Sequence, residues 1–260
     1  MRNATAPQRR LMLASAGAAG VILLVILLTT RGTDRRPSCR STLIPAYLTP
    51  RAIVDAVDGS SRPRLIVVNP QSGPGADEHP DYRRAVRAAQ RAGARVLGYV
   101  PTDYASRPIS DVMADVDRYA EWYGVDGVFL DEASHLSAQL PYYAALSRHI
   151  RASAKRLVVL NPGVVPAQGY FGLADVVVTF EGPYAAYAAA VERMPDWVRA
   201  QPPDHVAHLV YGASREQALS AVRNLDGAGY LYVTSGSLPD PWRALPDYLH
   251  EEEEALEACS

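Results

Sequence analysis

The strongest constraint on the fold is a regular alternation of short apolar runs with stretches of helical periodicity. Each run has the length and the β-branched content typical of a buried strand. The eight runs are Leu43–Leu48, Leu65–Asn69, Arg95–Val100, Gly127–Asp131, Leu157–Asn161, Val176–Glu181, His205–Tyr211 and Gly229–Thr234. Strands that alternate with helices pair in parallel, so the pattern predicts an α/β fold of the (β/α)8 TIM-barrel type.

The stretches between the runs have the apolar spacing of amphipathic helices. They are Pro80–Ala92, Ser110–Tyr123, Pro141–Ala154, Tyr184–Arg193, Ser214–Leu225 and Pro241–Ala258. Gly93 lies just past the first of them, where glycine commonly ends a helix. Ser110 is expected to cap the start of the second. The connection over residues 167–173 looks short.

An open doubly wound sheet is the alternative to a barrel. Sheets of that kind that bind dinucleotides carry a glycine-rich fingerprint directly after the first strand. Here the first run ends and continues as Tyr47-Leu48-Thr49-Pro50, which has no glycine. The barrel is therefore the favoured fold.

The N-terminal part of the chain has a different character from the rest. Residues 1–10 form a basic tail, and residues 11–30 contain no charge and are rich in Leu, Ile, Val, Ala and Gly. About 20 apolar residues suffice to span a bilayer. We expect residues 11–30 to be a single-pass transmembrane anchor, residues 31–41 a linker, and residues 42–260 an extracytoplasmic barrel domain. A cleaved signal peptide, and hence a secreted protein, is the alternative, although such peptides usually have a shorter apolar region.

Composition limits the partners of the barrel domain. The formal net charge of −2 and a pI near 6.3 argue against a nucleic-acid binder, which usually has a basic face. Fifteen Tyr against three Phe suit a polar groove, since each Tyr ring offers an apolar face and a hydroxyl. We expect a monomer with no cofactor and no metal.

The only cysteines in the sequence are Cys39 and Cys259, near the two ends of the barrel domain. The first and last elements of a closed barrel are neighbours, so a disulfide between them is plausible in an oxidising compartment. Two unrelated thiols are equally compatible with the sequence, because connectivity cannot be deduced from spacing.

Two acids end the apolar run within Tyr123–Ser134, and a third ends a later run. Parallel strands deliver their C-terminal residues to one face of a barrel, so Asp131 and Glu181 are expected to face each other there. Two converging carboxylates are what glycoside hydrolysis requires. We assign Asp131 as nucleophile or stabilising carboxylate and Glu181 as general acid/base. Glu132 is an alternative catalytic residue, although neighbours on a strand point to opposite sides unless the chain bends.

A structural role for the first acid pair is also possible, with Asp131 as a helix cap and Glu132 as a solvated loop residue. The other strand ends present amide, hydroxyl and aromatic groups that could bind a sugar. The predicted substrate-binding residues are Tyr47, Asn69, Ser72, Tyr99, Tyr104, Asn161 and Tyr211. Turn chemistry alone would also explain the loop over residues 69–75.

Two further stretches are interpreted as surface features. The run Glu251–Glu254 is typical of a solvated helix face. The proline-rich stretch Leu238–Pro241 is typical of a loop.

Several ordered motifs carry a resemblance to a known family. They are Ile66–Gly75, Val96–Val100, Tyr123–Glu132, Leu160–Gly163 and Val178–Glu181. Together they resemble the spherulin-4-type domain, a family of (β/α)8 glycoside hydrolases related to the endo-α-1,4-polygalactosaminidases. The resemblance covers roughly residues 43–232.

The resemblance implies an endo-acting hydrolase of galactosamine-containing polysaccharides such as galactosaminogalactan. It also implies that Asp131, Glu132 and Glu181 match the acidic positions of the family. A non-catalytic glycan-binding barrel remains an alternative, because a fold does not fix a function. A metal-dependent hydrolase is a weaker one, since histidines are sparse near the strand ends.

Overall fold

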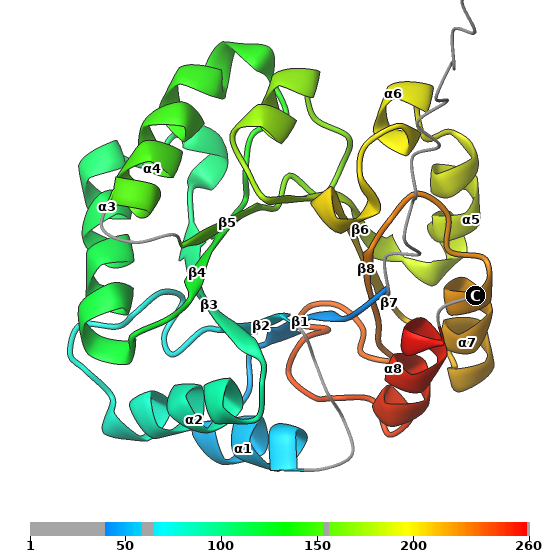
Figure 1. The fold of residues 1–260 in the computed structure, drawn as a ribbon, viewed down its shortest axis with the longest axis horizontal. Coiled ribbons are helices and arrows are strands. Elements are labelled where there is room, and N and C mark those ends of the chain that lie inside the picture. The colour runs from blue at the N-terminus through cyan, green and yellow to red at the C-terminus, as the bar shows by residue number, and fades with distance from the viewer. Residues whose placement is uncertain (1–39, 59–64, 153–155, 259–260) are drawn as a thin grey trace, which may run out of the picture. The chain divides into compact units, whose positions relative to one another are not determined.

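Parallel strands form a ring at the centre of the described chain (Figure 1). The computed structural model describes residues 40–58, 65–152 and 156–258. Eight strands follow one another around the sheet in chain order. Their bounds are β1 Leu43–Ala46, β2 Leu65–Val68, β3 Arg95–Pro101, β4 Gly127–Asp131, β5 Leu157–Leu160, β6 Val176–Pro183, β7 Val206–Tyr211 and β8 Tyr230–Val233. The predicted TIM barrel is confirmed.

Helices surround the strands on the outer side of the ring (Figure 1). Their bounds are α1 Pro50–Asp58, α2 Pro80–Arg91, α3 Ile109–Arg118, α4 Leu140–Ala152, α5 Tyr184–Glu192, α6 Asp196–Arg199, α7 Arg215–Arg223 and α8 Leu249–Glu257. The sequence did not predict α1 or α6, whose nine and four residues offer little periodicity to recognise. A 3-10 turn over Gln168–Gly172 fills the connection that looked short.

Two predicted helix starts are wrong. Pro108, whose backbone is extended, precedes α3 as its N-cap, so Ser110 lies inside the first turn. The last helix begins at Leu249 and not at Pro241. The residues in between form turns, and Pro241 and Trp242 are buried in them. Leu238–Pro241 is a loop as predicted, but its end is not a surface piece.

The barrel closes between β8 and β1 with few backbone hydrogen bonds. Ser41 and Tyr230 form an isolated parallel bridge, and Leu231 N–H donates to the Ser41 carbonyl at 3.0 Å. The next donor of this ladder, Val233 N–H, instead donates to Glu252 Oε1 of α8 at 2.8 Å. A carboxylate therefore takes the place of a strand carbonyl at this seam.

The glutamate run of α8 is not a solvated face, so that prediction is wrong. Glu252 is fully buried and Glu253 is 4% exposed, whereas Glu254 is exposed. Glu253 Oε1 accepts a hydrogen bond from the hydroxyl of Thr42, just before β1, at 3.1 Å. One buried carboxyl group thus binds β8 at Val233, and the other binds Thr42 just before β1. These two hydrogen bonds fix which side of α8 faces the barrel.

The membrane anchor predicted for residues 11–30 lies outside the described residues, as do Cys39 and Cys259. Within residues 40–58, 65–152 and 156–258, no helix has the length and apolarity needed to cross a bilayer.

Candidate active site

Strand register places the predicted acids on the inner side of the barrel. His208 of β7 contacts Tyr187 of α5, so it faces outward and its neighbour Leu209 faces inward. Glu181 pairs with Leu209 and shares its direction. The same alternation, carried through β5 to β4, turns Asp131 inward as well. Both acids therefore point into the mouth of the barrel at its C-terminal face.

Asn161, at the end of β5, joins the two acids. Its Nδ2 donates to Asp131 Oδ1 at 2.7 Å and to Glu181 Oε2 at 2.5 Å. Its Oδ1 accepts a hydrogen bond from Gly163 N–H at 3.0 Å, which fixes the orientation of the amide. Because both oxygens bind the same nitrogen, the distance between Asp131 Oδ1 and Glu181 Oε2 cannot exceed the sum of these two hydrogen-bond lengths.

Asp131 is surrounded by groups that favour its charged form. Burial raises its pKa, and three hydrogen bonds oppose the rise, from the Glu132 backbone, the Tyr99 side chain and Asn161. Hydrogen bonds to a carboxylate stabilise the ionised state. Asp131 is therefore equipped to remain a carboxylate.

Glu181 is biased towards its neutral form. Burial, followed by the charge of Asp131, raises the pKa of Glu181 to about 7, against opposing hydrogen bonds from Asn161 and the Trp242 side chain. Two neighbouring acids with different proton affinities provide one acid and one base. The geometry therefore supplies a proton donor beside an ionised carboxylate.

Aromatic rings line the same mouth. Tyr47 and Tyr99 contact each other edge to face, with ring centroids 5.3 Å apart. Tyr211 and Trp242 contact each other edge to face, with ring centroids 6.2 Å apart. The centroid of the Trp242 ring lies 5.9 Å from that of Tyr232. Tyr99, Trp242 and Tyr232 are buried, whereas Tyr47 and Tyr211 are partly exposed and can offer apolar surface to a sugar.

Glu132 occupies a bend that the sequence left open. Its φ of 50° is left-handed, so the chain turns at the end of β4 instead of continuing the strand. The turn is held by Thr102, whose Oγ1 donates to the Asp131 and Glu132 carbonyls within 3.0 Å and also contacts Tyr143 Oη. The Glu132 side chain is exposed, but the pKa of its carboxyl group is raised, first by partial burial and then by the negative charge of the nearby Asp131. Glu132 is thus a rim residue of the site.

Tyr104 lies on a strained turn at this rim. Asp103, Tyr104 and Ala105 are consecutive left-handed residues, with φ values of 46°, 52° and 72°. Tyr104 N–H donates to the Glu132 carbonyl at 2.7 Å, while its side chain is 58% exposed. Strain of this kind persists only where the surroundings impose it.

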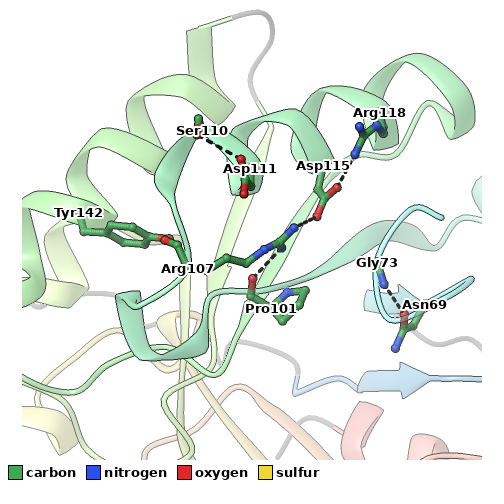
Figure 2. Close-up of polar contacts among 9 residues, drawn as sticks. All are labelled: Asn69, Gly73, Pro101, Arg107, Ser110, Asp111, Asp115, Arg118 and Tyr142. Atoms are coloured by element: carbon green, nitrogen blue, oxygen red, sulfur yellow. Dashed lines mark hydrogen bonds and ion pairs between the residues drawn. The ribbon is translucent and has the colours of Figure 1, made fainter. Parts of the chain in front are cut away.

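An ion cluster anchors Pro101 and Arg107, which flank this turn in the sequence (Figure 2). Arg107 donates to the Pro101 carbonyl at 3.0 Å and to Asp115 Oδ2 at 2.5 Å. Arg118 donates to the other oxygen of Asp115 at 2.8 Å, and the Tyr142 hydroxyl donates to the Arg107 carbonyl at 2.9 Å. The loop that carries Tyr104 is therefore anchored to β3, α3 and α4.

Asn69 and Ser72 lie on the neighbouring loop. Asn69 Oδ1 accepts the Gly73 N–H at 2.9 Å (Figure 2), and Ser72 is exposed with a φ of 50°. Among the described residues, neither side chain hydrogen-bonds Asp131 or Glu181. The predicted role of Asn69 and Ser72 in binding sugar hydroxyls stays a prediction.

Comparison with known proteins identifies the family. The model of spherulation-specific family 4 matches residues 41–256. The chain belongs to spherulation-specific family 4. Spherulin-4 of Physarum polycephalum is 31% identical over 237 residues, a match that spans 84% of this chain and 70% of that relative.

Solved structures confirm the fold of this family 4 chain. Sph3 of Aspergillus clavatus, solved in complex with GalNAc, has a TM-score of 0.72 at 24% identity and covers 85% of this chain and 99% of its own. A GH27 β-L-arabinopyranosidase of Geobacillus stearothermophilus has a TM-score of 0.55 at 11% identity, with 84% of this chain and 76% of its own covered. Identity this low shows a shared barrel and nothing finer.

Trp242 is the residue of the family 4 site that the sequence did not reveal. It is 6% exposed and hydrogen-bonds Glu181, yet it follows β8 by nine residues in a proline-rich loop. No periodicity marks such a position. The available signal was a Trp directly after Pro241, since large aromatic residues in loops need a surface to pack on.

Metal binding was the weaker alternative for this site. Within the described part of the chain, no three or more His, Cys, Asp or Glu side chains are grouped so that they could hold a metal ion.

Proposed function

We propose that this family 4 protein is an endo-acting glycoside hydrolase that cleaves an α-linked, galactosamine-containing polysaccharide. The observation that carries the proposal is the single amide of Asn161 that holds Asp131 and Glu181 together at the barrel mouth. Glycosidases need such a pair, one acid to protonate the leaving oxygen and one carboxylate to meet the developing positive charge.

The surroundings of the two acids support the roles that we propose for them. Glu181, with its pKa raised to about 7 by burial and by Asp131, is the general acid that protonates the glycosidic oxygen. Asp131 accepts more hydrogen bonds and is the nucleophile that attacks the anomeric carbon. Glu181 then removes a proton from the water that hydrolyses the glycosyl-enzyme.

The short bridge through Asn161 supports retention of configuration. Carboxyl groups lie about 5–5.5 Å apart in retaining glycosidases and about 6.5–9.5 Å apart in inverting ones, which must fit a water between them. Oxygens that share one amide nitrogen at 2.7 and 2.5 Å fit the closer class.

The proposed substrate rests on family resemblance and on the chemistry of the mouth. Sph3, the solved structure with GalNAc bound, shares the barrel. The tyrosine and tryptophan rings next to the acids suit the faces of a sugar. A cationic galactosamine unit would also be attracted by Glu132 at the rim and by the aromatic faces.

The test is release of reducing ends from galactosaminogalactan of defined acetylation, with neutral glucans as a control panel. We expect Asp131→Asn and Glu181→Gln each to lower kcat by about 10²-fold or more, because each removes one partner of the reaction. Glu254→Gln, an exposed glutamate of α8, is the matched control and should retain full activity.

Full activity of both site variants on every cleaved polymer would disprove the proposal. Binding of polysaccharide by wild type without release of reducing ends would instead indicate a glycan-binding barrel.

We also propose that residues 11–30 anchor the barrel to a membrane on its extracytoplasmic side. The uncharged length of that segment and its basic flanks support this. Alkaline carbonate extraction of cell membranes should leave the full-length protein in the membrane pellet. Recovery of all of it in the supernatant would contradict the anchor.

A further inference from the structure

Strand β6 contains one more residue than its partner β7 where the two strands pair. Val178 pairs with Ala207, and the next residue of β7, His208, pairs with Phe180. Thr179 therefore has no partner and forms a β-bulge. The bulge lies two residues before Glu181.

The bulge decides which way Glu181 points. Ala207 faces inward, and its partner Val178 does the same. In a regular strand Thr179 would then point outward, Phe180 inward and Glu181 outward, away from the pocket. A shift of one residue moves every later side chain to the other face.

Contacts on the outer side of the barrel show this shift directly. Thr179 Oγ1 lies 3.1 Å from His208 Nε2, and the Phe180 ring contacts Tyr187 of α5 with centroids 5.2 Å apart. Two consecutive side chains thus face the helices, and Glu181 is turned into the pocket. A Cβ placed on Gly182 would come within 2.9 Å of the Phe180 ring, so that ring also occupies the outer space beside residue 182.

We propose that His208 is a positioning residue for Glu181: it holds the extra residue Thr179 on the outer side of the barrel, and so keeps Glu181 in the active site. The proposal deepens the proposed function, because it takes Glu181 as the general acid. His208 lies on the outer side of the barrel, its hydrogen-bond partners among the described residues are Tyr187 and Thr179, and it acts on Glu181 through the backbone of β6.

The surroundings of His208 suit this task. The ring is 1% exposed, and each nitrogen has one hydroxyl partner, Tyr187 at 2.9 Å for Nδ1 and Thr179 for Nε2. The groups that face it from α5 and β6 are Tyr187, Thr179 and Phe180, none of which is charged. Burial lowers the pKa of His208 to about 4, so the ring is neutral, with one nitrogen donating and the other accepting.

Thr179→Val in the full-length protein is the primary test, because it keeps the shape of the side chain and removes the hydroxyl. The first readout is the titration of Glu181. It is monitored through the carboxyl band of Glu181 in infrared spectra, from which the spectrum of the Glu181→Gln variant is subtracted. We expect the pKa of Glu181 to move from about 7 towards its ordinary value as the group leaves its buried site beside Asp131. The second readout is kinetic: a roughly 10²-fold loss of kcat with KM changed by less than about threefold.

Two variants of His208 separate positioning from general destabilisation. His208→Gln keeps an amide donor near the position of Nε2, and we expect it to retain the wild-type titration and kcat within about threefold. His208→Leu loses the same hydrogen bond as Thr179→Val and should reproduce both losses. A folded Thr179→Val or His208→Leu protein with the wild-type Glu181 titration would overturn the proposal.

The infrared titration does not depend on catalysis, so the two proposals can fail separately. If wild type cleaves no polymer but Thr179→Val shifts the Glu181 titration, the hydrolase proposal fails and the positioning role stands. If wild type is active but a folded Thr179→Val or His208→Leu protein has the wild-type titration of Glu181, only the positioning role fails.

Discussion

At the scale of single residues, Asn161 binds two acids with the two hydrogens of one amide group. Its carbonyl oxygen accepts the Gly163 N–H, so the amide cannot turn over without losing a hydrogen bond. Because both acids receive the same donor, the difference between them must come from their other neighbours. Asp131 has the Tyr99 side chain and a backbone N–H, whereas Glu181 has the charge of Asp131 against it.

This difference predicts how activity depends on pH. Glu181 must carry a proton to act as an acid, and burial together with Asp131 raises its pKa to about 7. Its proton is present below that pH and lost above it, so we expect kcat/KM to fall as the pH rises through about 7. The measurement is kcat/KM between about pH 5 and about pH 9 on the best polymer substrate. A rate that stays level to the alkaline end would contradict the assignment of Glu181.

Site residues at regular strand ends could be predicted from the sequence. Asp131, Asn161 and Tyr99 lie at or near the ends of their strands, and Asp131 hydrogen-bonds both of the others. Trp242 could not be predicted, because its position depends on the path of a loop without periodicity. Ser72 was assigned to the site from loop composition, which does not determine where a side chain points.

At the scale of elements, the strands were easier to predict than the helices. Buried parallel strands produce apolar runs that are short and sharply bounded, and each of the eight runs matches a strand to within two residues at either end. Helix α1 was missed because its nine residues offer little periodicity to recognise. Helix α8 was predicted eight residues too early, since Pro241 suits a first helical turn equally well.

The direction of side chains in β6 could not be predicted at all. Residues 176–180 read Val-Val-Val-Thr-Phe, which contains no alternation of apolar and polar residues. The inward side of such a strand is set by pairing with β7 and by the partner of Thr179. Both are tertiary contacts, far apart in the sequence.

At the scale of the whole barrel, the ring is completed by side chains as well as by strands. Glu252 and Glu253 of α8 contact Val233 of β8 and Thr42 before β1, where backbone pairing is sparse. Burial, followed by the charge of Glu253, raises the pKa of Glu252 well above its usual range. One oxygen of Glu252 has no hydrogen-bond partner among the described residues. A protonated Glu252 fits this apolar seam better than a charged one.

This carboxyl group should make the stability of the barrel depend on pH. Folded Glu252 keeps its proton where an unfolded glutamate, with a pKa of about 4.3, has lost it, so the folded state is destabilised as the pH rises above that value. Gln has no such proton and can still accept the Val233 N–H. We expect the Tm of Glu252→Gln to rise relative to that of wild type as the pH is raised from about 4 to about 8. Each kcal/mol of difference in unfolding free energy should appear as about 2–4 °C in Tm.

Glu254→Gln, on the exposed side of the same helix, is the control for this effect and should follow wild type at every pH. Parallel melting curves for wild type and Glu252→Gln across that range would show that Glu252 ionises freely in the folded protein.

Because of the bulge in β6, substitutions at other positions could turn the Glu181 side chain out of the barrel mouth while residue 181 remains a glutamate. By this proposal, a descendant that lost the hydrogen bond between residues 179 and 208 would inherit both acids in its sequence and the same barrel, but one acid would point to the helices. Such a protein would keep the tyrosines and could still hold a glycan. If the positioning role of His208 holds, the presence of both acids in a related sequence is not enough to predict activity, and the residues on the outer side of β6 must be compared as well.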